Sequence, residues 1–133
     1  MSSSERDLDD VSEVLSRKAQ GDAKVLRLLA PNDEIGDDAV GFHAEQAIEK
    51  WLKAVIASRG EDFEFTHDLH RLAMLASHGT GELPFDVDLV LTLTQYAVPL
   101  RYEDLLDAQP LDRDATVTLV EQVGKWAAPQ LSG

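Results

Sequence analysis

The sequence predicts an all-α protein, an up-and-down four-helix bundle with an additional short helix. Apolar residues recur every three or four positions over several long segments, which is the period of a helix. Pro and Gly residues separate these segments by short connections, which favour antiparallel neighbours. The chain has 133 residues, 44% of them apolar and 28% charged, so we expect one globular domain over residues 1–133.

The first two helices are expected over residues 8–29 and 35–59, on either side of a break at Pro31. Within the second segment, a step of about 100° per residue places the larger apolar side chains on one wide face. These residues are Val40, Ala44, Ala47, Ile48, Trp51, Leu52 and Val55. Gly60 follows the last turn, as a helix C-cap often does. This second helix is therefore predicted to be the central one.

Three further helical segments follow. Thr66 is the expected N-cap of a third helix, and Asp86 caps a fourth. The fourth segment is rich in β-branched residues and a strand is its alternative, but no other segment offers a pairing partner, so a helix is favoured. Pro99 stops or kinks this helix. A final helix is expected over residues 112–128, closed by Pro129.

The charge balance limits the classes of function. The chain carries 25 acidic and 12 basic residues, a net charge of −13, and such a field repels phosphate backbones, which excludes broad nucleic-acid binding. It contains no cysteine, which excludes disulfides and thiolate chemistry. The first ten residues lack the pattern of a secretory signal and no long uncharged apolar run is present, so a cytoplasmic protein without a membrane segment is expected.

A polar stripe is predicted beside the apolar face of the central helix. His43, Gln46, Lys50 and Lys53 fall within an arc of roughly 80°, by the same helical step. Two cations in line with two hydrogen-bonding groups suit a phosphate or a carboxylate. The alternative is that both lysines are surface residues paired with Gln46 and Glu49 at helical spacing.

Two later segments offer further binding groups. In the segment Thr66-His67-Asp68-Leu69, His67 either contacts a ligand or a second subunit, or only caps and packs, while Asp68 complements a helix dipole. His67 and His70 lack a third ligand at metal spacing, so no metal is expected.

The segment after Pro99 offers a planar cation and an aromatic ring, Arg101 and Tyr102, which together suit a base and its phosphate. The alternative is an Arg101 paired with a nearby carboxylate and a Tyr102 half-buried at one end of the bundle.

The segments Phe42-His43-Ala44-Glu45-Gln46-Ala47-Ile48-Glu49-Lys50-Trp51-Leu52-Lys53-Ala54, Thr66-His67-Asp68-Leu69 and Arg101-Tyr102, in this order, resemble the HEPN domain (higher eukaryotes and prokaryotes nucleotide-binding). The resemblance spans about residues 37–103. It implies a helical bundle that usually forms homodimers and is often encoded beside a minimal nucleotidyltransferase, as two parts of a toxin–antitoxin-like pair.

Some members of that family are metal-independent ribonucleases, with a His four to six residues after a late Arg. Here no His follows Arg101 at that distance, and carboxylates stand there instead. Arg71 and His78 have a similar spacing but lie in another helix, so their match is attributed to chance. An enzyme is therefore not favoured, because cleavage of RNA requires a group that moves protons at the 2′-hydroxyl.

The sequence thus predicts a non-catalytic module without cofactor or metal that binds a nucleotide or presents the same surface to a nucleotidyltransferase partner. The apolar surface of five helices adds to the expectation of a homodimer. A ribonuclease toxin, intact or degenerate, and a helical dimeric scaffold are the alternatives. The expected ligand-binding residues are Gln46, Lys50, Lys53, His67, Arg101 and Tyr102, supported by His43, Glu49 and Asp68.

Overall fold

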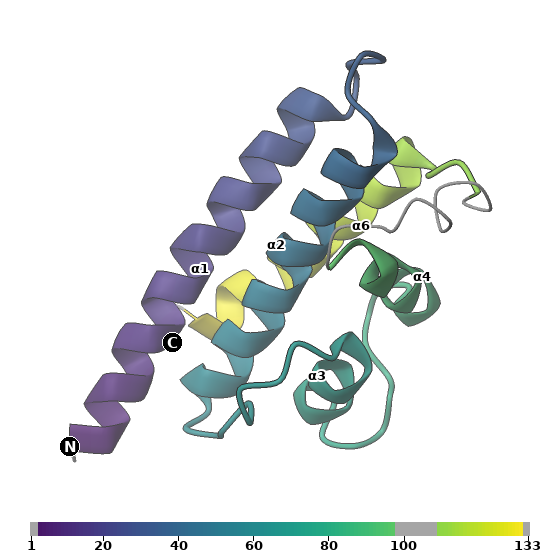
Figure 1. The fold of residues 1–133 in the computed structure, drawn as a ribbon. Coiled ribbons are helices and arrows are strands. Elements are labelled where there is room, and N and C mark those ends of the chain that lie inside the picture. The colour runs from purple at the N-terminus through teal and green to yellow at the C-terminus, as the bar shows by residue number, and fades with distance from the viewer. Residues whose placement is uncertain (1–2, 98–108, 132–133) are drawn as a thin grey trace.

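The computed structural model describes residues 3–97 and 109–131, and within these ranges the chain is helical without strands (Figure 1). The elements are α1 (Ser3–Leu29), α2 (Asp37–Ser58), α3 (Leu69–Ala76), α4 (Val87–Thr92), the 3-10 helix η1 (Leu93–Tyr96) and α6 (Arg113–Leu131). The all-α prediction is confirmed, and so is the choice of a helix rather than a strand for the fourth segment. None of these described helices is both long and apolar enough to cross a membrane.

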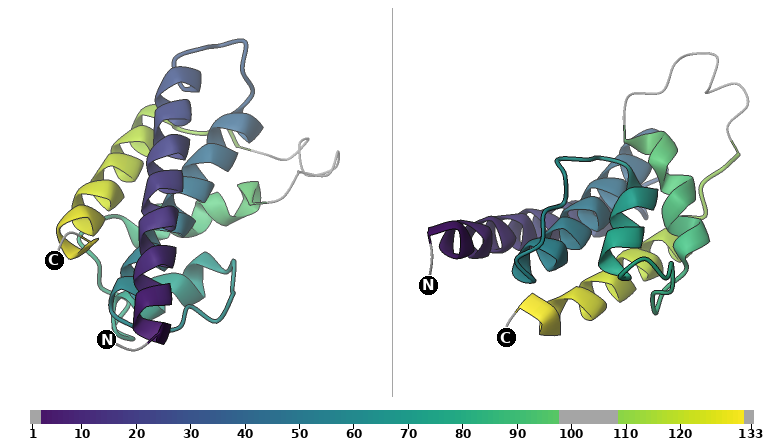
Figure 2. Two further views of the ribbon diagram at one scale, coloured as in Figure 1. Left: turned by 90° about the vertical axis from the view of Figure 1, so that its left-hand side faces the viewer. Right: turned by 90° about the horizontal axis from the view of Figure 1, so that it is seen from below.

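Three long helices, α1, α2 and α6, lie side by side, while α3 and η1 pack on the other side of α2, and α4 contacts α3, η1 and α6 (Figures 1 and 2). The direction of α1 is opposite to that of α2, whereas α2 and α6 run the same way (Figure 1). The prediction of four long helices is therefore not confirmed in the described part of the chain. The reason lies in residues 69–96, where a turn through Gly79 and Gly81 separates two short helices.

The core surrounds α2, as its apolar face predicts. All seven apolar residues expected on that face are buried. They pack against small and medium side chains of α1 and α6, namely Ala19, Ala23, Leu26, Leu119, Val120, Val123 and Ala127. Full burial of each leucine-sized side chain contributes about 1.5–3 kcal/mol, so this cluster is the main source of stability.

Two glycines allow aromatic rings to lie directly on helix backbones. A Cβ atom at Gly124 of α6 would lie 2.9 Å from the indole of Trp51, and one at Gly41 of α2 would lie 2.4 Å from the ring of Tyr96. Real Cβ atoms do not approach other atoms so closely, so these two positions exclude larger residues. The glycines thus set how closely α6 and η1 approach α2.

Two details at helix ends differ from the sequence predictions. The N-cap of α3 is Asp68, whose side chain accepts from the backbone of His70 and Arg71, while the Thr66 hydroxyl accepts from the Asp68 backbone instead. Pro129 lies inside α6, which continues to Leu131. By contrast, Asp86 is the N-cap of α4 as predicted.

The outer face of α1 also differs from the prediction. The helical period of residues 8–29 predicts an apolar stripe that begins with Leu8 and Val11 and has Ala19 and Ala23 in its middle. Val11 is 39% exposed, against this prediction, whereas Ala19 and Ala23 are buried as predicted, and their small size lets α1 approach α2 closely. Leu8, the first residue of that predicted stripe, lies among residues whose side chains the structure does not describe.

Candidate functional site

The predicted polar stripe of α2 is present, but its side chains divide into two ion-paired groups. His43 and Lys50 turn toward α1, where they meet Asp22. Lys53 turns toward the segment that joins α2 to α3, residues 59–68, which we call the connector. Lys50 and Lys53 therefore do not converge on one point, although they are three residues apart.

The first group, the Asp22 cluster, consists of Asp22, His43 and Lys50. One carboxylate serves both cationic groups: Lys50 Nζ lies 2.5 Å from Oδ2, and His43 Nδ1 lies 3.0 Å from Oδ1. All three side chains are largely buried, with exposed fractions of 13%, 27% and 22%. The partner of Lys50 comes from another helix and is neither Gln46 nor Glu49, the partners that the alternative interpretation assigned to it.

The second group, the Glu49 cluster, consists of Glu45, Gln46, Glu49, Lys53 and His67. Glu49 Oε2 accepts from Lys53 Nζ at 3.4 Å and lies 3.1 Å from His67 Nδ1. Lys53 is buried, whereas the His67 side chain is 76% exposed. The cluster therefore joins a buried ion pair to an imidazole at the surface.

Glu45 is the functional candidate that the sequence analysis missed. It is fully buried, its Oε2 accepts from Gln46 Nε2 at 2.7 Å, and its Oε1 has no hydrogen-bond partner among the described residues. Burial, and then the charge of Glu49, raise the pKa of Glu45 to about 8, although the Gln46 bond opposes the shift. At neutral pH this carboxyl is therefore mainly protonated.

We expect the stability of the protein to fall as the pH rises from about 4.5 to about 8, because the unfolded chain releases the Glu45 proton earlier than the folded chain does. Glu45→Gln, which imitates the protonated carboxyl, should stabilise the protein by on the order of 2 kcal/mol at the upper end of this range. Urea unfolding at both ends of the range measures this. Parallel pH profiles for the variant and the wild type would contradict it, and the exposed Glu13→Gln is the control.

The remaining predicted residues have different positions. Asp68 caps α3 through bonds of 2.9 Å and 3.4 Å to backbone nitrogens, so its place fits the dipole role. Arg101 and Tyr102 lie outside the described residues, and the predicted meeting of this pair with the lysines stays a prediction. No group of three potential metal ligands occurs among residues 3–97 and 109–131.

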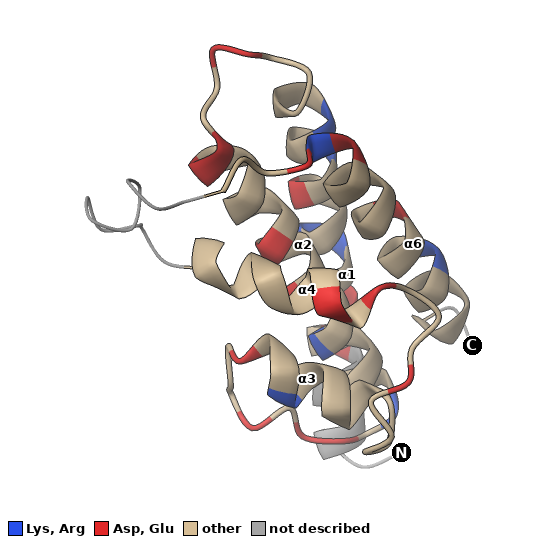
Figure 3. Ribbon diagram, turned by 90° about the vertical axis from the view of Figure 1, so that its right-hand side faces the viewer, with Lys and Arg blue, Asp and Glu red and all other residues tan. Residues whose placement is uncertain are grey.

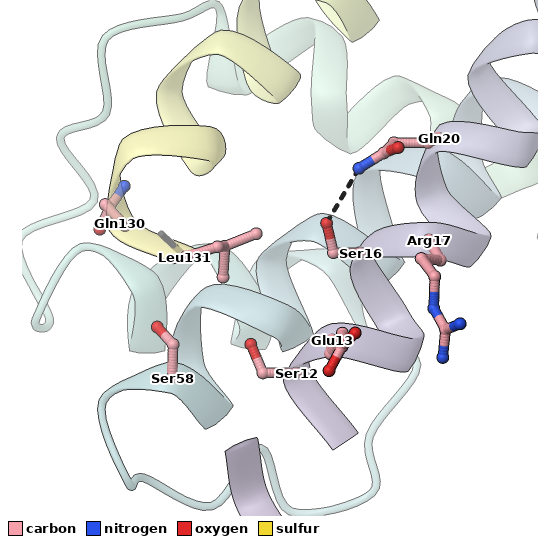
Figure 4. Close-up of a pocket in the computed structure, with 8 residues that line it drawn as sticks. All are labelled: Ser12, Glu13, Ser16, Arg17, Gln20, Ser58, Gln130 and Leu131. Atoms are coloured by element: carbon pink, nitrogen blue, oxygen red, sulfur yellow. Dashed lines mark hydrogen bonds between the residues drawn. The ribbon is translucent and has the colours of Figure 1, made fainter. Parts of the chain in front are cut away.

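A cavity of about 460 Å³ lies at the end of the bundle where α1, α2 and α6 come together (Figure 4). It is lined by Ser12, Glu13, Ser16, Arg17, Gln20, Ser58, Gln130 and Leu131. Several of its polar groups bond within the chain: Gln20 donates to Ser16, and the Ser12 hydroxyl donates to the carbonyl of Ala54. None of the predicted site residues lines this cavity, and its single cation is matched by one carboxylate.

The structure is thus a helical bundle whose central helix, α2, carries a stripe of polar and charged residues. A family model of the HEPN domain matches residues 12–129, which is most of the chain. The chain therefore belongs to the HEPN domain family. No curated protein and no solved structure matches it.

Proposed function

We propose that this chain is a non-catalytic HEPN module that acts by binding a minimal nucleotidyltransferase, as one part of a toxin–antitoxin-like pair. One observation supports binding of a protein rather than a free nucleotide. Within the described residues, the basic side chains of the predicted site, which we call the signature cations, each contact a carboxylate of the same chain. His43 and Lys50 contact Asp22, and Lys53 and His67 contact Glu49.

The paired cations are poor sites for a phosphate. A phosphate that approached Lys50 would have to displace Asp22, and one that approached Lys53 would have to displace Glu49. The net charge of −13 also repels small anions at low ionic strength. A nucleotide is therefore better held by the partner enzyme, which this module contacts.

The test is co-expression of the full chain with a candidate minimal nucleotidyltransferase from the same genome, followed by light scattering of the purified mixture. A stable complex that contains both proteins, with a mass larger than that of either one alone, is the expected result. Two proteins that migrate separately, with and without ATP, would contradict the proposal.

A metal-independent ribonuclease is the second candidate, and the geometry of His67 favours it. Nδ1 of this exposed imidazole lies 3.1 Å from Glu49 Oε2 and 3.4 Å from Lys53 Nζ, so Nε2 is the nitrogen that remains for proton transfer with a substrate. Incubation of RNA with the protein in chelator tests this, with His67→Ala and Arg101→Ala as comparison variants. Cleavage that is absent, or that both variants retain, excludes this candidate.

We also propose that two copies of the chain pair through the outer face of α1. Val11, Val14 and Leu28 lie toward one side of that helix and are 39%, 40% and 76% exposed. Val11 and Val14 are one turn apart, whereas Leu28 lies near the other end of α1, beyond Arg17, Lys18 and Lys24. The proposed contact therefore centres on the two valines, which face away from the side where Ala19 and Ala23 pack into the core.

Sedimentation equilibrium is therefore expected to give a dimer of 14.6-kDa chains for the wild type and a monomer for Val14→Glu, because a buried charge without a partner opposes association. Gln20→Glu, an exposed position on another side of α1, should leave the dimer intact. A monomeric wild type, or a dimeric Val14→Glu, would show that this face does not form the contact.

A further inference from the structure

Phe65 in the connector is unusually exposed to solvent. Its side chain is 84% exposed, the largest value among the large apolar residues that the structure describes. Its backbone φ is 52°, in the left-handed region that residues other than glycine seldom adopt. An exposed phenyl ring on a strained backbone costs stability, and folding alone offers no compensation for it.

Hydrogen bonds within the connector and with Arg71 hold the residue before Phe65, and one aromatic contact orients its ring. The guanidinium of Arg71 bonds both carboxylate oxygens of Glu64, at 3.0 Å and 2.7 Å, and Asp62 accepts from the Glu64 backbone at 2.7 Å. The ring of Phe65 meets that of Phe63 edge to face, with centroids 5.8 Å apart. An aromatic side chain fixed before binding loses little entropy when a partner covers it.

The surroundings of Phe65 are acidic. Glu61, Asp62, Glu64 and Asp68 all belong to the connector, and Figure 3 shows acidic residues along the loops that lead into α3 and α4. Arg71 is already bonded to Glu64, and Lys53, whose ammonium lies 5.4 Å from the centre of the Phe63 ring, is bonded to Glu49. A phosphate is therefore disfavoured beside Phe65, whereas lysine and arginine side chains of a protein are favoured.

We propose that Phe65 is the anchor of a docking surface for a basic partner protein, which receives the ring in an apolar socket edged by lysine or arginine side chains. This inference depends on the proposed function, because it names the surface through which the nucleotidyltransferase is bound. Fixed aromatic side chains surrounded by complementary charge are typical centres of protein interfaces.

The test uses the full chain and a display library of random peptides as the probe, selected on the wild type and then measured on variants. Phe65→Asn removes the ring and keeps the fold, since Asn tolerates the left-handed backbone. Phe42→Asn, at a position 39% exposed on α2 and outside both the connector and the proposed dimer face, is the matched control.

The selected peptides should combine an apolar residue with Lys or Arg. They should bind Phe65→Asn on the order of tenfold more weakly, or worse, while Phe42→Asn binds them as the wild type does. Peptides without basic residues, or with equal affinity for Phe65→Asn, would overturn the inference. A wild-type dimer that Phe65→Asn dissociates would overturn it too, because the occupant would then be a second copy.

The co-expression experiment separates this inference from the proposed function. If the nucleotidyltransferase binds the wild type and Phe65→Asn equally, the docking surface is wrong and the proposed function stands. If it binds neither, the proposed function fails, and so does the assignment of that enzyme to this surface.

Discussion

Gly41→Ala is expected to lower the free energy of unfolding by about 3 kcal/mol or more. The new methyl group would lie 2.4–2.6 Å from three ring atoms of Tyr96, which is far inside van der Waals contact. Tyr96 is only 5% exposed and belongs to the core, so its ring has no free space into which it can move. Urea unfolding followed by circular dichroism measures the loss.

Gly21→Ala is the matched control, because this glycine also lies inside a long helix but has no atom within 4 Å of an added Cβ. It should stabilise the protein by about 1 kcal/mol through helix propensity. Tyr96→Ala in the Gly41→Ala background should cost less than the sum of the two single changes. Equal effects of the two glycine substitutions would contradict the steric account.

Arg113→Ala is expected to destabilise the protein by about 3 kcal/mol, because one guanidinium holds the whole loop between α1 and α2. Its nitrogens donate to the carbonyls of Ala30, Asn32 and Ile35 at 3.1, 3.1 and 2.5 Å, and to Asp37 Oδ1 at 3.0 Å. Removal leaves the carbonyls of Ala30 and Ile35 without this donor. The Asn32 carbonyl keeps the Ile35 N–H, and the Asp37 carboxylate keeps the Leu111 N–H. Thermal unfolding measures the effect.

Arg113→Lys should recover little of this stability. The acceptors surround a planar guanidinium with several nitrogens, and a single ammonium group cannot donate to all of them. Arg17→Lys, at an exposed position of α1, should be close to neutral and serves as the control. A fully stable Arg113→Lys protein would show that charge alone, rather than the geometry of the fork, holds the loop.

The central helix was predictable because one uninterrupted period of apolar residues spans its length and Gly60 follows its end. The predicted range of 35–59 lies close to the observed Asp37–Ser58. Residues 66–97 were harder, since their apolar pattern is compatible with long helices. Turns through His78 and Gly79, both with positive φ, end α3 after eight residues, and such turns depend on tertiary packing.

The position of Pro129 shows a second limit of sequence reasoning. A proline inside a helix removes one backbone donor, and a stop was the simplest expectation. In the structure α6 continues for two more residues, and Gln130 Nε2 donates to the carbonyl of Trp126, while Arg59 donates to Gln130 Oε1. The contact from Arg59 comes from the end of α2, and the pattern of one helix does not contain it.

For the candidate site, the sequence identified the residues of the stripe but not their partners. Asp22 lies 28 positions before Lys50. Nothing in the sequence distinguishes it from the many other carboxylates as the partner of this lysine. Glu45 was within the quoted motif, and the helical step that placed Lys50 would also have put Glu45 on the core side, beside Gly41 and Leu52. A buried carboxyl inside an apolar face was the signal available for finding it.

The most direct test of whether the signature cations are occupied by the chain's own carboxylates is calorimetric titration of ATP into the wild type and Asp22→Asn. We expect no saturable binding to the wild type, and a measurable gain in Asp22→Asn, which releases Lys50 and His43 from their shared partner. Tight binding of ATP by the wild type that Lys50→Ala abolishes would contradict this account.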